Sequence, residues 1–305
     1  MLLAIGYAVA AAAANAASNV LQRKSNREAA PELSMSPRLI LDVAKRPAWL
    51  LGFAASALSF VLMFAALSRG SLAAVQPILV LELPLSLLGG VFLFGDRLGG
   101  REWAATVLMS VGLAGLIFFL SPGLGDKGNA ADDVWLLAGC ATVGLAVVCV
   151  LAALRSSGGR KAGLLGAASG ILFGLTSALM KGVTPSLHHG VTGVLTTWQT
   201  YALVVVGAAA MFLMQNALHA GRLVASQPGM TLLDPAIAIL WGIFVFQEPV
   251  SVGAFLVLGV VSGLVMAGGA VLLTRSPLLE AGEEGTTDHD QTQAAREEAA
   301  AAASC

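Results

Sequence analysis

The chain is a succession of long apolar stretches separated by short polar loops. A helix needs about 20 apolar residues to cross a bilayer, so stretches of about 18 or more predict membrane-spanning helices. Nine stretches meet this length, at 2–21, 48–68, 71–94, 103–120, 134–154, 162–180, 196–218, 223–246 and 251–273. We therefore predict an all-α membrane protein with nine transmembrane helices.

The composition supports this fold class. Hydrophobic residues make up 57% of the 305 residues, charged residues only 11%, and the mean hydropathy is +0.81. Soluble domains carry about 25% charged residues. The lipid bilayer is thus the expected partner, and a net charge of −1 gives no reason to expect nucleic acid. No basic residue precedes Arg23, so stretch 2–21 is interpreted as an uncleaved first helix, not a signal peptide.

Lysines and arginines predict the orientation, because positively charged loops stay in the cytoplasm. With nine spans, 14 of the 17 basic residues fall on one side, and only Arg69, Lys127 and Lys181 fall on the other. This bias predicts a multi-pass protein of the plasma membrane, with its N-terminus outside and its C-terminus in the cytoplasm. The basic segment 22–47 is expected to be a cytoplasmic linker, and the acidic tail 276–305 to be disordered.

A short pattern occurs twice within the apolar stretches. Gln76-Pro77 is followed by Glu82 and Pro84, and Gln227-Pro228 is followed by Asp234 and Pro235. The copies lie 151 positions apart, an offset that also pairs Gly112 with Gly263. The carboxylates are out of register by one position, since Glu82 lies two residues before its proline and Asp234 directly before. The repetition predicts a site with unequal contributions from the two copies.

The offset relates spans one to four to spans six to nine and leaves span five over. Because the copies begin an odd number of helices apart, they cross the membrane in opposite directions. We therefore predict a 4+1+4 inverted-topology repeat, an architecture of many secondary transporters that places the substrate near the midplane. The predicted parts are a first repeat at 1–122, a linker with the fifth helix at 123–160, a second repeat at 161–275 and the tail at 276–305.

Glu82 and Asp234 are the strongest candidates for binding a substrate or ion. A charge in the middle of a membrane helix costs about 2.5–3.5 kcal/mol on insertion scales, so such residues normally face the bundle interior or a water-filled cavity. The pair is expected to bind a proton, another cation or an amine-bearing solute. The alternative is a structural role, in which each carboxyl group bonds a carbonyl that a neighbouring proline has freed.

The prolines and polar residues of the same spans extend the candidate site. Each of the helix-breaking residues Pro77, Pro84, Pro228 and Pro235 leaves a carbonyl without its helical partner, and such a carbonyl can serve as a ligand. Gln76 and Gln227 are expected to contact substrate, or to form plain interhelical hydrogen bonds.

Span one carries polar residues on one face, whereas spans six and nine carry regularly spaced glycines. Span one places a polar stripe on one helical face, which either lines the pathway or holds the helix to its neighbours: Asn15, Ser18, Asn19 and Gln22. Spans six and nine carry small residues at the spacing that permits close helix packing: Gly166, Gly170, Gly174, Gly259 and Gly263.

Other chemistry has no support in the sequence. The three cysteines and the histidines form no ligand cluster, and whether a metal binds is left open. No phosphate-binding glycine loop, HExxH or GxSxG motif occurs, so we expect neither an enzyme nor a cofactor. Asp96 and Glu248 are interpreted as acids at helix termini. Four tryptophans near span ends are assigned to aromatic belts: Trp49, Trp103, Trp135 and Trp198.

Two turns resemble a known family. Phe94-Gly95-Asp96-Arg97-Leu98 with the following glycine-rich helix resembles the end of an EamA repeat of the drug/metabolite transporter superfamily, and Phe246-Gln247-Glu248-Pro249 resembles its second copy. The nine-helix pattern with a basic first loop is most similar to the branch of NIPA-type magnesium transporters. The resemblance covers roughly residues 2–275.

Together these patterns predict a secondary transporter working by alternating access. The cargo is a small polar or amphipathic solute or a cation; Mg²⁺, which binds through one or two carboxylates while keeping waters, is the alternative. A non-transporting membrane scaffold is the second alternative. The sequence leaves a homodimer open.

Overall fold

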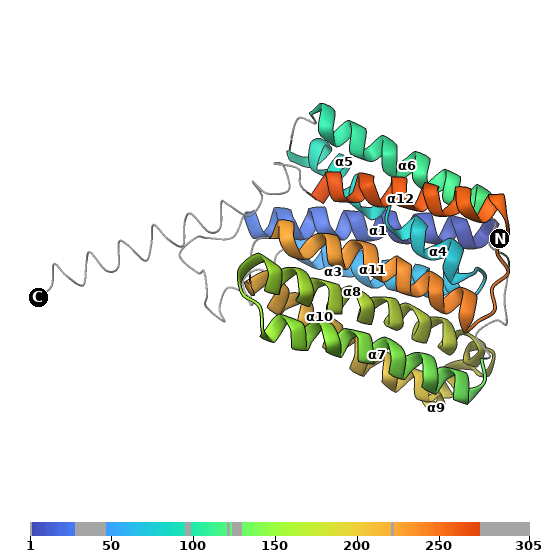
Figure 1. Ribbon diagram of the computed structural model, residues 1–305. Helices are drawn as coiled ribbons and strands as arrows, with labels where there is room; N and C mark the ends of the chain where they lie inside the picture. Colours follow the sequence, from blue (N-terminus) through green and yellow to red (C-terminus); the bar gives the residue numbers. More distant parts are fainter. Residues whose placement is uncertain are drawn as a thin grey trace, which may run out of the picture.

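The computed structural model describes residues 2–27, 47–94, 99–120, 123, 130–220 and 223–274. Every regular element in these ranges is helical, which confirms the all-α prediction (Figure 1). The helices are α1 (Leu2–Arg27), α3 (Pro47–Leu67), α4 (Leu72–Leu79), α5 (Glu82–Phe94), α6 (Gly100–Leu120), α7 (Asp132–Leu154), α8 (Gly158–Val183), the 3-10 helix η2 (Thr184–His189), α9 (Gly190–Thr196), α10 (Trp198–Ala220), α11 (Leu223–Phe244) and α12 (Ala254–Thr274).

Within the described ranges, eight helical segments are long and apolar enough to cross a membrane. One of them joins α4 and α5, and another joins α8, η2 and α9. The predicted eighth span corresponds to α11, whose described apolar part is Gly229–Phe244. The protein is therefore a multi-pass membrane protein, as its hydropathy predicts.

The main differences from the predicted elements concern the first span, the third span and the connection between spans six and seven. Helix α1 continues to Arg27, because the polar residues after position 21 include no helix breaker, so the predicted linker loses its first residues to the helix. The third span is interrupted at Val80 and Leu81 and forms two helices. The connection between spans six and seven is helical, as η2 and α9. Most of the predicted linker and the whole predicted tail lie outside the described residues.

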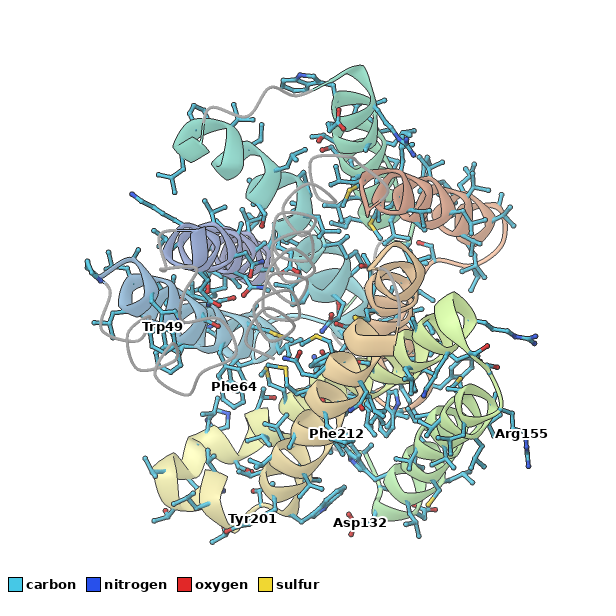
Figure 2. All side chains as sticks on the ribbon, turned by 90° about the vertical axis from the view of Figure 1, so that its left-hand side faces the viewer. Trp49, Phe64, Asp132, Arg155, Tyr201 and Phe212 are labelled. Atoms are coloured by element: carbon cyan, nitrogen blue, oxygen red, sulfur yellow. The ribbon has the colours of Figure 1, made fainter. Side chains whose placement is uncertain are left out.

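The helices pack in groups around α1 and α8. Helix α1 packs against α3 and against both α4 and α5, while α8 packs against α7, α10 and α11. Helix α6 lies along α12, and α11 joins the groups through its contacts with α4 and α12. Figure 2 looks along the bundle and shows Tyr201 and Arg155 at its rim. Large apolar side chains such as Phe92 and Phe118 cover the outside, which is the surface that lipid requires.

Glycines set the distance between the most closely packed helices. On α6, a Cβ atom added to Gly112 would lie 2.4 Å from the backbone nitrogen of Met266 on α12. On α8, a Cβ atom at Gly174 would lie 2.7 Å from the carbonyl oxygen of Asp234 on α11. The predicted packing role is also confirmed for Gly259 and Gly263, where an added Cβ would meet Leu120 and Leu116.

Gly112→Ala is expected to destabilise the protein, because the new methyl group must push α6 away from α12. Overpacking of this kind costs about 1–3 kcal/mol. The matched control is Gly144→Ala on α7, where an added Cβ meets nothing within 4 Å. There alanine should be neutral or slightly stabilising, since it favours a helix over glycine by about 0.5–1 kcal/mol. Thermal unfolding in detergent measures both; equal unfolding temperatures would contradict the packing.

Candidate functional site

Glu82 lies where the third membrane-crossing segment is interrupted. Helix α4 contains Pro77 and ends at Leu79, and α5 begins with Glu82, which stands in its first turn. The N-terminal end of a helix carries unpaired N–H groups and a partial positive charge, so it stabilises a carboxylate there. The interruption thus places an acid near the middle of the segment Leu72–Leu93.

Asn15 of α1 contacts this acid directly. Its Nδ2 group donates a hydrogen bond to Oε2 of Glu82. The face of α1 that packs inward consists largely of alanine, including the fully buried Ala8, Ala11 and Ala12, so the backbones of α4 and α5 can come close. The polar stripe of span one therefore supplies one residue that holds the carboxyl group of Glu82.

Asp234 approaches the same region from α11. The glycine at position 174 of α8 allows close contact with α11 at the level of Asp234. The carboxyl groups of Asp234 and Glu82 are close enough to interact electrostatically, with repulsion when both are charged. Oδ1 of Asp234 is buried and has no hydrogen-bond partner among the described residues. The two acids predicted from separate copies of the repeat are thus brought together.

Basic side chains do not neutralise this pair in the part of the chain that the structure describes. Asn15 provides the side-chain hydrogen bond that acts on Glu82, and Glu82 itself is the charged group that acts on Asp234. Two neighbouring carboxyl groups without a cation favour binding of a proton or a positively charged ligand. The arrangement can therefore bind a cation, or take up and release a proton.

The remaining polar candidates divide into two groups. Gln76 is buried on α4, and its Nε2 has no hydrogen-bond partner among the described residues, so it is available to a ligand in another conformation. Asn19 is exposed on the outside of α1, and the structure does not bring it to the carboxylate pair. The side chains of Gln227 and Pro228 lie outside the described part, although the backbone there belongs to α11.

The prolines act differently in the two copies. Pro77 and Pro84 flank the interruption between α4 and α5, whereas Pro235 lies inside α11, which remains one helix. Pro84 has no N–H group, so the carbonyl of Val80 loses its helical partner. The N–H group of Leu83 donates to that carbonyl at 3.2 Å. This carbonyl is therefore not the unpartnered ligand that the sequence predicts.

A second polar cluster joins the beginning of α4 to distant parts of the chain. Lys181 and Glu248 form an ion pair with 3.4 Å between Nζ and Oε1, and the two side chains are 3% and 0% exposed. Glu248 also accepts the N–H groups of Leu72 at 2.7 Å and Ala73 at 3.0 Å, and Lys181 donates to the carbonyl of Gly70. We call these five residues the clasp.

Glu248 does act at a helix terminus, as the sequence predicts, but the helix is α4, and Asp96 lies outside the described residues. It reaches α4 because the chain turns sharply after α11. Gln247 adopts a φ of 51°, in the left-handed region that favours glycine, and the N–H group of Glu248 donates to the carbonyl of Gly242. The lone Lys181 at the end of an apolar span could have suggested a buried partner. Nothing in the sequence identifies that partner as Glu248.

One cavity in the described part of the protein lies near the clasp, away from the carboxylate pair. It is an open depression of about 600 Å³, and neither Glu82 nor Asp234 lines it. Its walls come from the start of α7, the end of α8, η2 and the beginning of α10, with the residues Ala130, Ala131, Gly182, Pro185, Ser186, Thr196, Thr197, Trp198 and Gln199.

Comparison with known proteins gives one relative and no function. A protein of Corynebacterium glutamicum, described as uncharacterized, is 29% identical over 291 residues, which cover 93% of this chain and 98% of the relative. No family model matches the chain. No solved structure matches it either. The similarity therefore extends along almost the whole of both chains.

Asn15→Ala should destabilise the protein, because it removes the hydrogen bond to Glu82 inside the bundle. Leaving a buried acceptor without its donor costs about 1–3 kcal/mol. The control is Asn216→Ala on α10, where the exposed side chain donates only to the carbonyl of Phe212 in its own helix. We expect a lower unfolding temperature in detergent for the first variant alone. A similar decrease in both would mean that the contact with Glu82 has no special weight.

Proposed function

We propose that the protein is a secondary transporter that carries a cation, or a small polar or amphipathic solute together with protons, by alternating access. The observation that carries this proposal is the meeting of Glu82 and Asp234 near the middle of the membrane-crossing helices, with no basic partner among the described residues. Acids at this depth typically mark ion or proton pathways.

The packing of the helices supports an inverted repeat. Helix α1 contacts α3 and then α4 and α5, just as α8 contacts α10 and then α11, and the last helices of the two proposed repeats, α6 and α12, pack together. Helix α7 is left over and packs mainly against α8. In this arrangement the carboxylate pair lies where the two repeats meet, which is where such transporters bind their cargo.

The carboxylate pair favours a positively charged cargo. A protonated amine can be held by one ionised carboxylate and by the amide oxygen of Asn15. A divalent cation such as Mg²⁺ is the second candidate, because it can bind through one or two carboxylates and keep its waters. Within the described residues, no group of three or more His, Cys, Asp or Glu side chains could hold a metal. As cargo, Mg²⁺ would bind through the two carboxylates and keep several of its waters.

The proposed orientation places the clasp outside the cell. Most of the described basic residues lie toward the opposite end of the helices: Lys24, Arg101, Arg155, Arg160 and Lys161. Arg155 points away from the bundle in Figure 2. The positive-inside rule assigns that end to the cytoplasm and the beginning of α1 to the outside of a plasma membrane.

A non-transporting scaffold explains the two acids less well. A structural carboxyl group inside a membrane protein is expected to have its hydrogen bonds satisfied, because an unpaired polar group costs free energy there. Oδ1 of Asp234 is buried without such a partner. This atom favours a site that is completed by a ligand or a proton.

Transport in proteoliposomes tests the proposal. Mg²⁺ and a panel of amine-bearing and neutral solutes are offered to the wild type and to Glu82→Gln and Asp234→Asn. Either substitution is expected to lower the initial flux at least about tenfold, equivalent to about 1.4 kcal/mol, because a charge that holds the cargo is lost. The control is Asp133→Asn, which changes an exposed acid at the start of α7 and should leave flux unchanged. Equal flux in all four proteins would remove the carboxylate pair from the mechanism.

A further inference from the structure

The clasp ties elements that belong to opposite halves of the molecule. Gly70 and the first two residues of α4 come from the first half, and Lys181 and Glu248 come from the second. The contacts with Leu72 and Ala73 span 176 and 175 positions in the sequence. Helix α4 is thus held against α8 and the turn after α11 at one end of the bundle.

This end of the structure is closely packed. All residues of α4 from Leu72 to Ile78 are buried. A Cβ atom added to Gly242 would lie 2.3 Å from Oε2 of Glu248 in the clasp. One added to Gly70 would lie 2.6 Å from the Cβ atom of Ala4 on α1. Neither position therefore has room for an added methyl group. The start of α4 and the turn after α11 are thus tightly packed where the clasp joins them.

The other half of the same span is held differently. Helix α5 has α1 as its main neighbour, whereas α4 contacts α1 and α11 and, less extensively, α3, α6 and α8. The interruption at Val80 and Leu81 lies between α4 and α5. Because the two helices are not one continuous rod, α4 can change its position while α5 stays in place. We take this interruption, directly before Glu82, as the point about which α4 would turn.

Ionic groups suit a contact that opens and closes. A contact that never opens gains little stability from buried charges, since replacing a buried ion pair with apolar side chains is often neutral or stabilising. When an ion pair separates into water, however, both groups recover their hydration, so the open state is not penalised as exposed apolar surface would be. The N–H groups of Leu72 and Ala73 would likewise be hydrated in the open state.

We propose that Lys181 and Glu248 are positioning residues that keep the clasp end closed, and that separating them lets α4 move and opens the path to Glu82 and Asp234 from that end. The proposal rests on the transporter function proposed above. On α8, Lys181 lies seven residues beyond Gly174, which is about 10 Å along the helix axis from the level of Asp234. The clasp is therefore a gate near the carboxylate pair, and its residues do not touch the cargo.

Cysteine labelling in nanodiscs tests this gate, because both faces of the membrane are open to the reagent. Cys140, Cys149 and Cys305 are first replaced with alanine. Ser71→Cys then reports on the clasp end and Ser86→Cys on α5. Both serines are suitable because their hydroxyl groups are buried and make no hydrogen bond, so neither substitution removes one. The rate of reaction with a maleimide is measured for each reporter with and without the clasp charges.

Lys181→Met removes the ion pair and leaves the contacts of Glu248 with α4 in place. Glu248→Gln weakens both the ion pair and the contacts with α4. We expect labelling at Ser71→Cys to rise at least about tenfold in either background, because the open state becomes more populated. Labelling at Ser86→Cys should stay constant or fall. A general loosening of the fold would raise both rates equally and overturn the proposal, as would an unchanged rate at Ser71→Cys. If one clasp variant fails to fold, as judged by size-exclusion chromatography, the other decides.

The labelling result and the flux result can fail separately. A selective rise at Ser71→Cys without any measurable transport would contradict the transporter function and leave the conformational role of the clasp. Transport that depends on Glu82 and Asp234, together with unchanged labelling in Lys181→Met, would support the transporter and contradict the gate.

Discussion

Inside a bilayer, each backbone N–H and C=O group must find its partner within the protein, because lipid offers none. This constraint explains why every described element is helical, and it also governs the third span, which is interrupted. At the interruption, Leu83 donates to the carbonyl that Pro84 leaves free. At the start of α4, the first two N–H groups have no helical partner, and Glu248 accepts both from across the molecule. The need to satisfy the first N–H groups of α4 thus produces a contact between distant parts of the chain.

The two acidic clusters differ in how fully they are satisfied. In the clasp, Glu248 has a cation and two N–H donors, and removing one partner of such a buried pair typically costs about 3–5 kcal/mol. Glu82 and Asp234 have Asn15 and each other. A cluster with complete internal bonding holds a structure together, whereas an incomplete one can take a ligand. The same residue type therefore serves two purposes at two depths of one bundle.

Hydropathy predicts the membrane-crossing helices well, because lipid imposes a length and a composition that are visible in the sequence. The repeated pattern also identified Glu82 and Asp234, which the packing brings together. The break at Val80 and Leu81 was not predictable, since Pro235 in the other copy leaves α11 continuous. The contact of Lys181 with Glu248 was missed because two residues 67 positions apart produce no recognisable pattern in the sequence. The same holds for Trp135, which is buried in the core and not in an aromatic belt.

That tryptophan has a practical consequence. The ring of Trp135 lies within 5.6 Å of the rings of Trp198, Trp241 and Phe246, measured between centroids. The group adjoins the clasp on two sides, since Gly182 packs against Trp135 and Phe246 lies two residues before Glu248. Indole emission depends on the polarity of its surroundings. Three of the five tryptophans belong to this group. The wavelength of tryptophan fluorescence should therefore shift when water enters this end of the bundle.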